Sequence, residues 1–254
     1  MPVDLNSDMG ESYGVYSIGA DDEILRWVTS ANVACGWHGG DPQVMRRTVQ
    51  QAKELGVRVG AHPSYPDLLG FGRRAMQITR QQARDYLLYQ IGALRAFCEA
   101  LGVQLQHVKP HGAIYNVAVK DRELSLGIAE GVREAGGDLI LVGLSDSELV
   151  RAGKEIGVRV AREAFGDRAY NEDGTLVSRR LPGSLIADPD AVAERVLGLV
   201  RGTVRAITGA SIRLEADTVC LHGDTPGAGI IARRVREQLE AAGIRPTPMG
   251  EFVG

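Results

Sequence analysis

Predicted strands and helices alternate seven times along this chain of 254 residues, and no other feature of the sequence restricts its fold as strongly. Each predicted strand is a short apolar or alternating segment, and apolar residues at helical spacing follow it. This alternation is typical of parallel strands joined by helical crossovers, which are nearly always right-handed. The predicted strands cover residues 3–8, 31–36, 58–61, 107–109, 138–143, 158–163 and 217–221.

Local signals mark several helix ends. Asp41 is a predicted N-cap, and Pro42 follows it as the first helical residue. Thr79 and Gln82 have the spacing of a capping box, and Asp21 is a further predicted N-cap. The last two helices are expected over residues 188–207 and 226–242.

Polar side chains gather just after the predicted strands, which favours a closed barrel over an open, doubly wound sheet. Four of the five histidines lie just past the carboxyl end of a strand. In a barrel these ends surround one mouth, whereas in an open sheet they spread along an edge. The polar residues concerned are Asn6, Asp8, Glu11, His38, Asp41, His62, Lys109, His111, Glu163, Asp167, Arg168, His222 and Asp224. We therefore predict an α/β fold, a TIM-like barrel of seven strands, with residues 1–254 as one domain around a shared pocket.

Composition and charge argue against several other classes of protein. A net charge of -3 without a long basic run is not typical of a nucleic-acid-binding protein. The N-terminus lacks the apolar segment of a signal peptide, and no apolar stretch approaches the length of a membrane span. Cys35, Cys98 and Cys220 are scattered without metal or disulfide spacing, so reduced thiols are expected. These features predict a soluble cytoplasmic protein.

Some weaker signals have structural alternatives. Cys35 is more typical of a small buried core residue than of a nucleophile, because no base lies at local spacing. Arg73 and Arg74 could hold a carboxylate or a phosphate, or form a solvated pair. Trp37 could form the pocket floor or pack over the barrel rim. His107 points from the body of its strand, which favours a satisfied core histidine.

The predicted pocket indicates hydrolysis or elimination on a small polar substrate. The sequence contains no Gly-x-x-x-x-Gly-Lys loop, no Gly-x-Gly-x-x-Gly turn and no Gly-x-Ser-x-Gly elbow. Imidazoles, carboxylates and one lysine suit proton transfer, with Lys109 as a partner for an oxyanion or a carboxylate. A divalent metal that activates water is the open alternative. Its ligands would be two or three of Asp8, His38, His62, His111 and His222.

Six segments resemble the LamB/YcsF family. In order along nearly the whole chain they are residues 4–11, 30–38, 60–63, 108–116, 163–170 and 220–224. The departures are small: Trp37 stands where phenylalanine is usual, and Gly39 and Gly166 stand where alanine is usual. None of them removes an ionisable group, so activity is expected to be retained.

The resemblance implies a distorted barrel of the glycoside hydrolase/deacetylase type and a specific reaction. That reaction is the ATP-dependent opening of 5-oxoproline (pyroglutamate) to glutamate, together with two partner subunits, B and C. An unstrained five-membered lactam is a poor electrophile, and phosphorylation of its oxygen would give an activated imidate that water can attack. Since the chain shows no nucleotide-binding loop, we expect the partner subunits to phosphorylate and this chain to hydrolyse the activated lactam.

Within this interpretation the pocket residues receive provisional roles. Lys109 is expected to pair with the substrate carboxylate or a phosphoryl oxygen, and Asp8 or Glu163 to position or deprotonate water. His111 and His222 are expected to shuttle protons. The complete predicted catalytic set is Asp8, His38, His62, Lys109, His111, Glu163, His222 and Asp224. The predicted substrate-binding set is Asn6, Glu11, Asp41, Arg73, Tyr115, Asn116 and Arg168.

Two other functions fit the same residues. One is a metal-dependent deacetylase or polysaccharide hydrolase on the same barrel. The other is a sugar- or lactam-binding module without catalysis, which would leave the many titratable groups unexplained.

Overall fold

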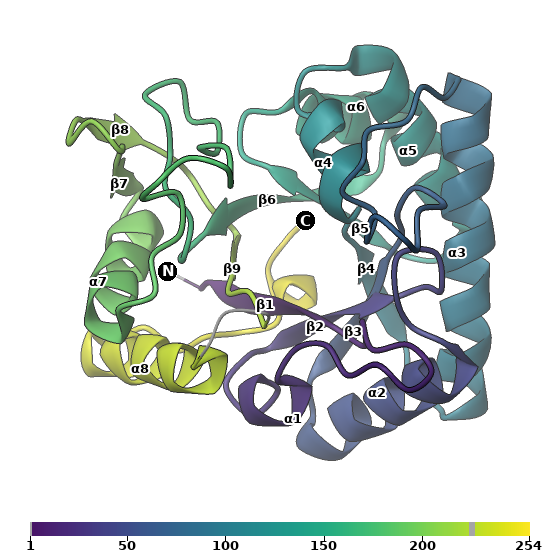
Figure 1. The fold of residues 1–254 in the computed structure, drawn as a ribbon, viewed down its shortest axis with the longest axis horizontal. Coiled ribbons are helices and arrows are strands. Elements are labelled where there is room, and N and C mark those ends of the chain that lie inside the picture. Colours follow the sequence, from purple (N-terminus) through teal and green to yellow (C-terminus); the bar gives the residue numbers. More distant parts are fainter. Residues whose placement is uncertain (1, 224–226) are drawn as a thin grey trace.

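The computed structural model describes residues 2–223 and 227–254, and in these ranges seven parallel strands close into a barrel (Figure 1). The last barrel strand pairs with both the first and the sixth, which completes the ring. In spatial order the strands are β1 (Asp4–Met9), β2 (Ser30–Ala34), β3 (Arg58–His62), β4 (Leu105–Val108), β5 (Ile140–Leu144), β6 (Arg159–Phe165) and β9 (Thr218–Cys220). The predicted seven-stranded barrel is confirmed.

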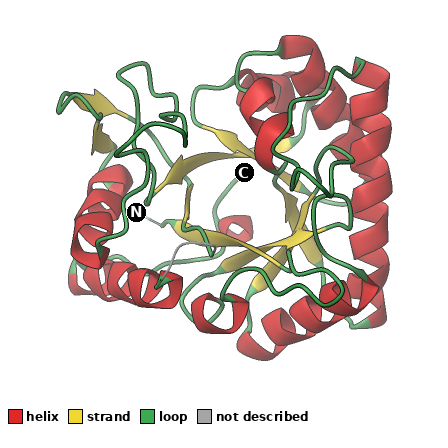
Figure 2. Ribbon diagram, viewed as in Figure 1, coloured by secondary structure: helices red, strands yellow, loops and turns green. Residues whose placement is uncertain are grey.

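Helices surround the ring of strands, as Figure 2 shows. Their bounds are α1 (Asp21–Ile24), α2 (Pro42–Leu55), α3 (Arg80–Ala100), α4 (Gly112–Ala118), α5 (Arg122–Ala135), α6 (Glu148–Ile156), α7 (Pro189–Val200) and α8 (Ala228–Ala241). A short 3-10 helix, η1 (Met249–Glu251), follows near the C-terminus. Within the described ranges, none of the helices combines the length and the apolar character that crossing a bilayer requires.

The helix starts confirm two of the three predicted caps. The Asp41 carboxylate accepts hydrogen bonds from the backbone N–H groups of residues 43 and 44, and Thr79 forms the capping box with Gln82. The prediction for Asp21 was wrong, because this residue lies inside α1. Its carboxylate instead accepts a hydrogen bond of 2.8 Å from the Gly10 backbone N–H, and burial raises the pKa of Asp21 to about 6. This bond ties the end of β1 to α1.

Two segments differ from the sequence prediction, and one predicted helix start cannot be compared with the structure. Helix α7 ends at Val200 rather than near residue 207, because Gly202 turns the chain with a positive φ into the antiparallel hairpin of β7 (Thr203–Arg205) and β8 (Ser211–Arg213). This hairpin lies outside the barrel (Figure 1). Helix α4 begins directly after His111, in a segment for which the sequence analysis names no helix. The predicted start of the last helix at Pro226 lies outside the described residues.

A glycine in β3 makes room for a histidine of the neighbouring strand. His107 is fully buried, and its Nε2 lies 2.7 Å from the Asn32 Oδ1, on the far side of β3. Its other ring nitrogen lies 3.2 Å from the Gln106 Nε2, so the expected satisfied core histidine is confirmed. A β-carbon added at Gly60 would lie 2.1 Å from the His107 Nε2. Only glycine leaves space for this crossing side chain.

Gly60→Ala is therefore expected to lower the free energy of unfolding by about 3 kcal/mol, because the new methyl group overlaps a packed ring. Urea unfolding measures the change. Gly92→Ala on α3 is the matched control. Apart from the adjoining backbone of α3, its β-carbon would meet no described atom within 4 Å, so the free energy of unfolding should rise by up to about 1 kcal/mol. The double variant Gly60→Ala/His107→Ala should recover part of the loss. Equal stability of the two single variants would contradict this account of β3.

Candidate functional site

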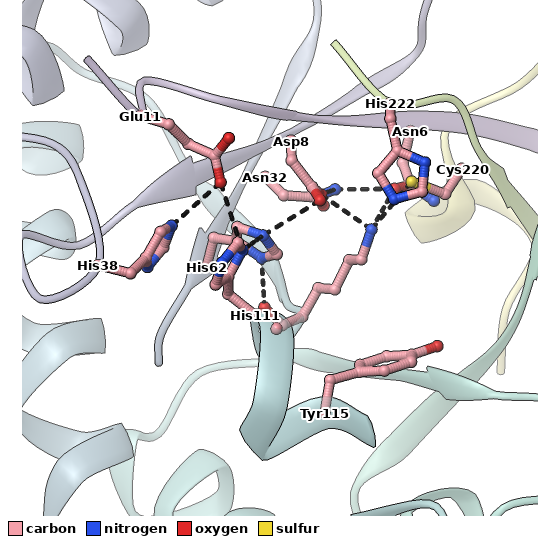
Figure 3. A network of polar contacts seen from close by, with 12 residues as sticks. Asn6, Asp8, Glu11, Asn32, His38, His62, His111, Tyr115, Cys220 and His222 are labelled. Carbon is pink, nitrogen blue, oxygen red and sulfur yellow. Dashed lines mark hydrogen bonds and ion pairs between the residues drawn. The ribbon is translucent and has the colours of Figure 1, made fainter. Parts of the chain in front are cut away.

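Side chains at or just past the carboxyl ends of several barrel strands converge at one mouth (Figure 3). A cavity of about 750 Å³ opens there. The sequence-predicted residues that line it are Asp8, His62, Arg73, Lys109, His111, Tyr115, Asn116, Arg168 and His222. His38 does not line the cavity, but its ring stacks on the ring of His111 with a centroid separation of 3.7 Å. The predicted convergence of four strand-end histidines on one region is therefore present.

Lys109 occupies the centre of the site and is 2% exposed. Its Nζ lies 2.9 Å from the Asp8 Oδ1 and 2.9 Å from the Glu163 Oε1. The same ammonium lies 3.2 Å from the Asn6 Oδ1 and 3.1 Å from the Cys220 Sγ. Burial alone would lower the pKa of Lys109, but the two carboxylates raise it well above its usual value. The site therefore contains a permanent, buried positive charge.

Asp8 is held as a carboxylate on the cavity wall. Its Oδ1 accepts hydrogen bonds from the Asn32 Nδ2, at 2.8 Å, and from the Lys109 Nζ. Its Oδ2 lies 3.3 Å from the His62 Nε2. Burial would raise the pKa of Asp8, but His62 and Lys109 outweigh it and lower this pKa well below its usual value. Asp8 therefore stays ionised, and its oxygens can accept a hydrogen bond from a water molecule that enters the cavity.

Glu163 has a different environment from Asp8. It is fully buried and does not line the cavity. Its Oε1 accepts a hydrogen bond of 3.1 Å from the Asn6 Nδ2, and its Oε2 accepts one of 2.6 Å from the Tyr115 hydroxyl. Burial and this carboxylate raise the pKa of Tyr115 well above its usual value, so Tyr115 stays a phenol. Of the two acids predicted to meet water, the geometry favours Asp8, and Glu163 holds Lys109.

Three histidines and one glutamate form a second cluster beside Asp8, the Glu11 cluster (Glu11, His38, His62 and His111). The Glu11 Oε1 lies 3.1 Å from the His38 Nε2 and 3.3 Å from the His111 Nδ1. The His62 Nε2 lies 3.0 Å from the same His111 nitrogen. Burial, reinforced by the neighbouring imidazoles, lowers the pKa of His38 and of His111 well below the usual value. These two rings are therefore neutral.

Two groups of side chains within the described ranges have donor atoms close enough to share a metal ion. In the Glu11 cluster all four donor atoms lie within 4.8 Å of one another, and three imidazoles with a carboxylate suit a transition metal. The other group is Asp8, Cys220 and His222. There the Lys109 ammonium already contacts Asp8 and Cys220, and burial raises the pKa of the Cys220 thiol well above its usual value. The donor atoms of the first group therefore suit a metal ion. In the second group the Lys109 ammonium already makes contacts that a metal ion would make.

His222 lines the cavity and is oriented by the buried carboxylate of Asp167. Its Nδ1 lies 2.8 Å and 2.9 Å from the two oxygens of Asp167, and its backbone N–H donates to one of them at 3.1 Å. Its ring also stacks on Phe165, with centroids 5.5 Å apart. Burial would raise the pKa of Asp167, but His222 outweighs it and lowers this pKa. The neighbouring Asp224, also predicted as catalytic, lies outside the described residues.

Arginine side chains make part of the cavity wall basic. Arg73, Arg168, Arg179 and Arg180 all line it. The buried Arg168 guanidinium donates a hydrogen bond of 2.7 Å to the backbone carbonyl of residue 177, and its Nε has no hydrogen-bond partner among the described residues. Burial and the nearby Arg179 lower the pKa of Arg168 to about 10, so it remains a cation. A wall of this kind suits an anionic substrate.

Other predicted residues lie outside the cavity. The Asp41 oxygens accept three backbone N–H groups, at residues 14, 43 and 44, and this side chain does not line the cavity. Trp37 packs on Tyr86 and Tyr89 of α3. Arg74 forms an ion pair with Asp67. Cys35 is a buried core residue, as expected, and burial raises the pKa of its thiol to about 12.

Sequence reasoning missed several residues of the site. Asn32 donates hydrogen bonds to both Asn6 and Asp8, and Cys220 contacts Lys109. Both lie within strands, and the register pairs Asn32 with Asp8 and Cys220 with Asn6. These two residues could have been found by looking for polar residues at matching register on neighbouring strands. The register, however, is known only once the strands are paired.

Comparisons with known proteins agree on one family. The model of the LamB/YcsF family matches residues 3–254. The A subunit of the 5-oxoprolinase of Pyrococcus abyssi is 56% identical over 255 residues and covers 100% of both chains, and that of Bacillus subtilis is 53% identical over 250 residues and covers 98% of this chain and 97% of its own. The crystal structure of the lactam utilization protein from Thermus thermophilus superposes with a TM-score of 0.92 at 47% identity, covering 97% of this chain and 99% of its own.

Proposed function

Because the chain belongs to the LamB/YcsF family, we propose that it is the A subunit of a 5-oxoprolinase. The proposed reaction hydrolyses the lactam amide of 5-oxoproline to L-glutamate, coupled to the hydrolysis of ATP to ADP and phosphate. Subunits B and C are the proposed partners, and the cytoplasm is the proposed location. The names of relatives that match over nearly their full length support the assignment.

One observation carries this proposal at the level of chemistry: a buried ammonium lies between two carboxylates at the base of a cavity with a partly basic wall. Lys109 and the arginines Arg73 and Arg168 can neutralise a substrate carboxylate and a phosphoryl group. Asp8, on the same cavity, can accept a proton from water. Both a cation for the activated lactam and a base for its nucleophile are therefore present.

We divide the reaction between the subunits in the following way. The partners transfer a phosphoryl group from ATP to the lactam oxygen, because this chain has no nucleotide-binding loop. Water then adds to the ring carbon of the activated lactam, giving up a proton to Asp8. When the C–N bond breaks, the nitrogen takes a proton from His222. The added hydroxyl group releases its proton to solvent and becomes the carbonyl of an acyl phosphate. A second water converts this acyl phosphate to glutamate and phosphate.

The proposal is tested by measuring glutamate release from 5-oxoproline and ATP with purified proteins. We expect release when this chain is combined with subunits B and C, and no release from this chain alone or from B and C alone. If the complete mixture releases no glutamate, the proposed function is wrong. If this chain alone turns over ATP with 5-oxoproline at the full rate, the function stands but the division of labour is wrong.

A further inference from the structure

The backbone determines the hydrogen positions on two rings of the Glu11 cluster. The His62 Nδ1 lies 2.7 Å from the backbone carbonyl of Lys109, and the His111 Nε2 lies 2.9 Å from the carbonyl of Phe71. A carbonyl oxygen only accepts, so each of these nitrogens carries a hydrogen. The other nitrogens of these two rings are the His62 Nε2 and the His111 Nδ1. They face each other across 3.0 Å.

Two more donor atoms meet at the same point. Glu11 reaches both the His111 Nδ1, at 3.3 Å, and the His38 Nε2, at 3.1 Å, with a single oxygen. Figure 3 shows the four side chains directed toward one another from the ends of their strands. Ligands bound to one ion at about 2.0–2.2 Å lie about 3.0–3.5 Å apart, which is the spacing of these contacts. A single ion could contact all four of these atoms, whereas one hydrogen bond joins only two of them.

We propose that Glu11, His38, His62 and His111 bind a divalent transition-metal ion, with Zn²⁺ as the best match to three imidazoles and one carboxylate. All four side chains are buried, and the carbonyls of Phe71 and Lys109 hold two of the rings as outer hydrogen-bond partners do in metal sites. Hard cations such as Mg²⁺ prefer oxygen ligands and fit this set poorly.

The site lies beside the group proposed to meet water, since the His62 Nε2 is also 3.3 Å from the Asp8 Oδ2. Metal binding nevertheless stands independently of the proposed function, because it is measured on this chain without substrate or partners. A failure of metal binding and a failure of glutamate release are therefore separate results.

The experiment uses the full chain without a histidine tag, stripped of metal by a chelator and titrated with Zn²⁺ against a chromophoric competitor. Elemental analysis counts the bound ions, and the visible absorption of the Co²⁺-loaded protein reports the ligands. We expect one Zn²⁺ per chain. We expect binding to weaken at least about 100-fold in His62→Ala and in His111→Ala.

Two further variants keep the result decisive. Glu11→Gln preserves the shape of the side chain, so it should remain folded by circular dichroism while binding Zn²⁺ about 10- to 100-fold more weakly. His222→Asn removes a histidine of the other candidate group and should bind as the wild type does. The proposal is overturned if the wild type takes up no stoichiometric Zn²⁺ at micromolar concentration, or if only His222→Asn abolishes binding.

Discussion

Replacing Lys109 by methionine is expected to lower glutamate release by the three-subunit complex about 10³-fold, because the cavity loses its buried cation. Methionine has nearly the length of lysine, so the shape of the site is largely kept. The variant also leaves the partly buried Asp8 and the fully buried Glu163 without the ammonium that lies 2.9 Å from each. An uncompensated buried charge costs about 3–5 kcal/mol, so the free energy of unfolding should fall by that amount.

Two companion variants separate catalysis from folding in this experiment. Lys154→Met removes an exposed lysine of α6 and should change activity less than about twofold and stability by less than about 0.5 kcal/mol. Lys109→Met/Glu163→Gln removes one of the unpaired charges and should recover stability without recovering activity. Near wild-type turnover by Lys109→Met would remove the end of β4 from the mechanism.

The barrel and the convergence of its histidines were predictable because topology determines both. Right-handed crossovers place the carboxyl ends of parallel strands at one mouth, so His62 and His222 could be brought together without knowing any distance. The local signal for each helix start was also sufficient for Asp41 and Thr79, where the capping residue and the first turn are adjacent in sequence.

What could not be predicted depends on pairing between segments far apart in the chain. Asp41 was expected to bind substrate, yet its carboxylate is engaged as a helix cap, and no composition signal distinguishes these uses. Asp21 was expected to cap a helix, and instead it bonds Gly10 across a loop. Cys220 and Asn32 became site residues only through strand register. The charged side chains of the site were easier to identify from the sequence than the neutral side chains that contact them, such as Asn32 and Cys220.

Asp8 joins the two halves of the site that the structure reveals. One of its oxygens meets Lys109 and the other meets His62, at 2.9 Å and 3.3 Å. The permanent cation and the Glu11 cluster are therefore linked through a single carboxylate. A substitution in either half should therefore change the surroundings of the Asp8 carboxylate. For this reason the metal content of each sample should be measured when variants of the Glu11 cluster are assayed for glutamate release.

Asp167→Asn is expected to reduce the kcat of glutamate release about 10²- to 10⁴-fold while leaving KM nearly unchanged. The Asp167 carboxylate accepts the hydrogen on the His222 Nδ1 at 2.8 Å, which leaves the Nε2 of this cavity-lining ring for proton transfer. An asparagine can turn its NH₂ group toward the Nδ1 and hold the opposite tautomer, whereas its size and packing match those of the aspartate.

The split between kcat and KM identifies Asp167 as a positioning residue, since it acts through His222 and does not line the cavity. Steady-state kinetics of the three-subunit complex measures both constants, and thermal unfolding shows whether the variant keeps its fold. Asp190→Asn, which changes an aspartate on α7 whose side chain is 77% exposed, is the matched control and should behave as the wild type does. A variant Asp167→Asn that retained the wild-type kcat would show that proton transfer does not depend on His222 being held by this carboxylate. A rise in KM with unchanged kcat would instead assign Asp167 to substrate binding, and either result would contradict the role argued here.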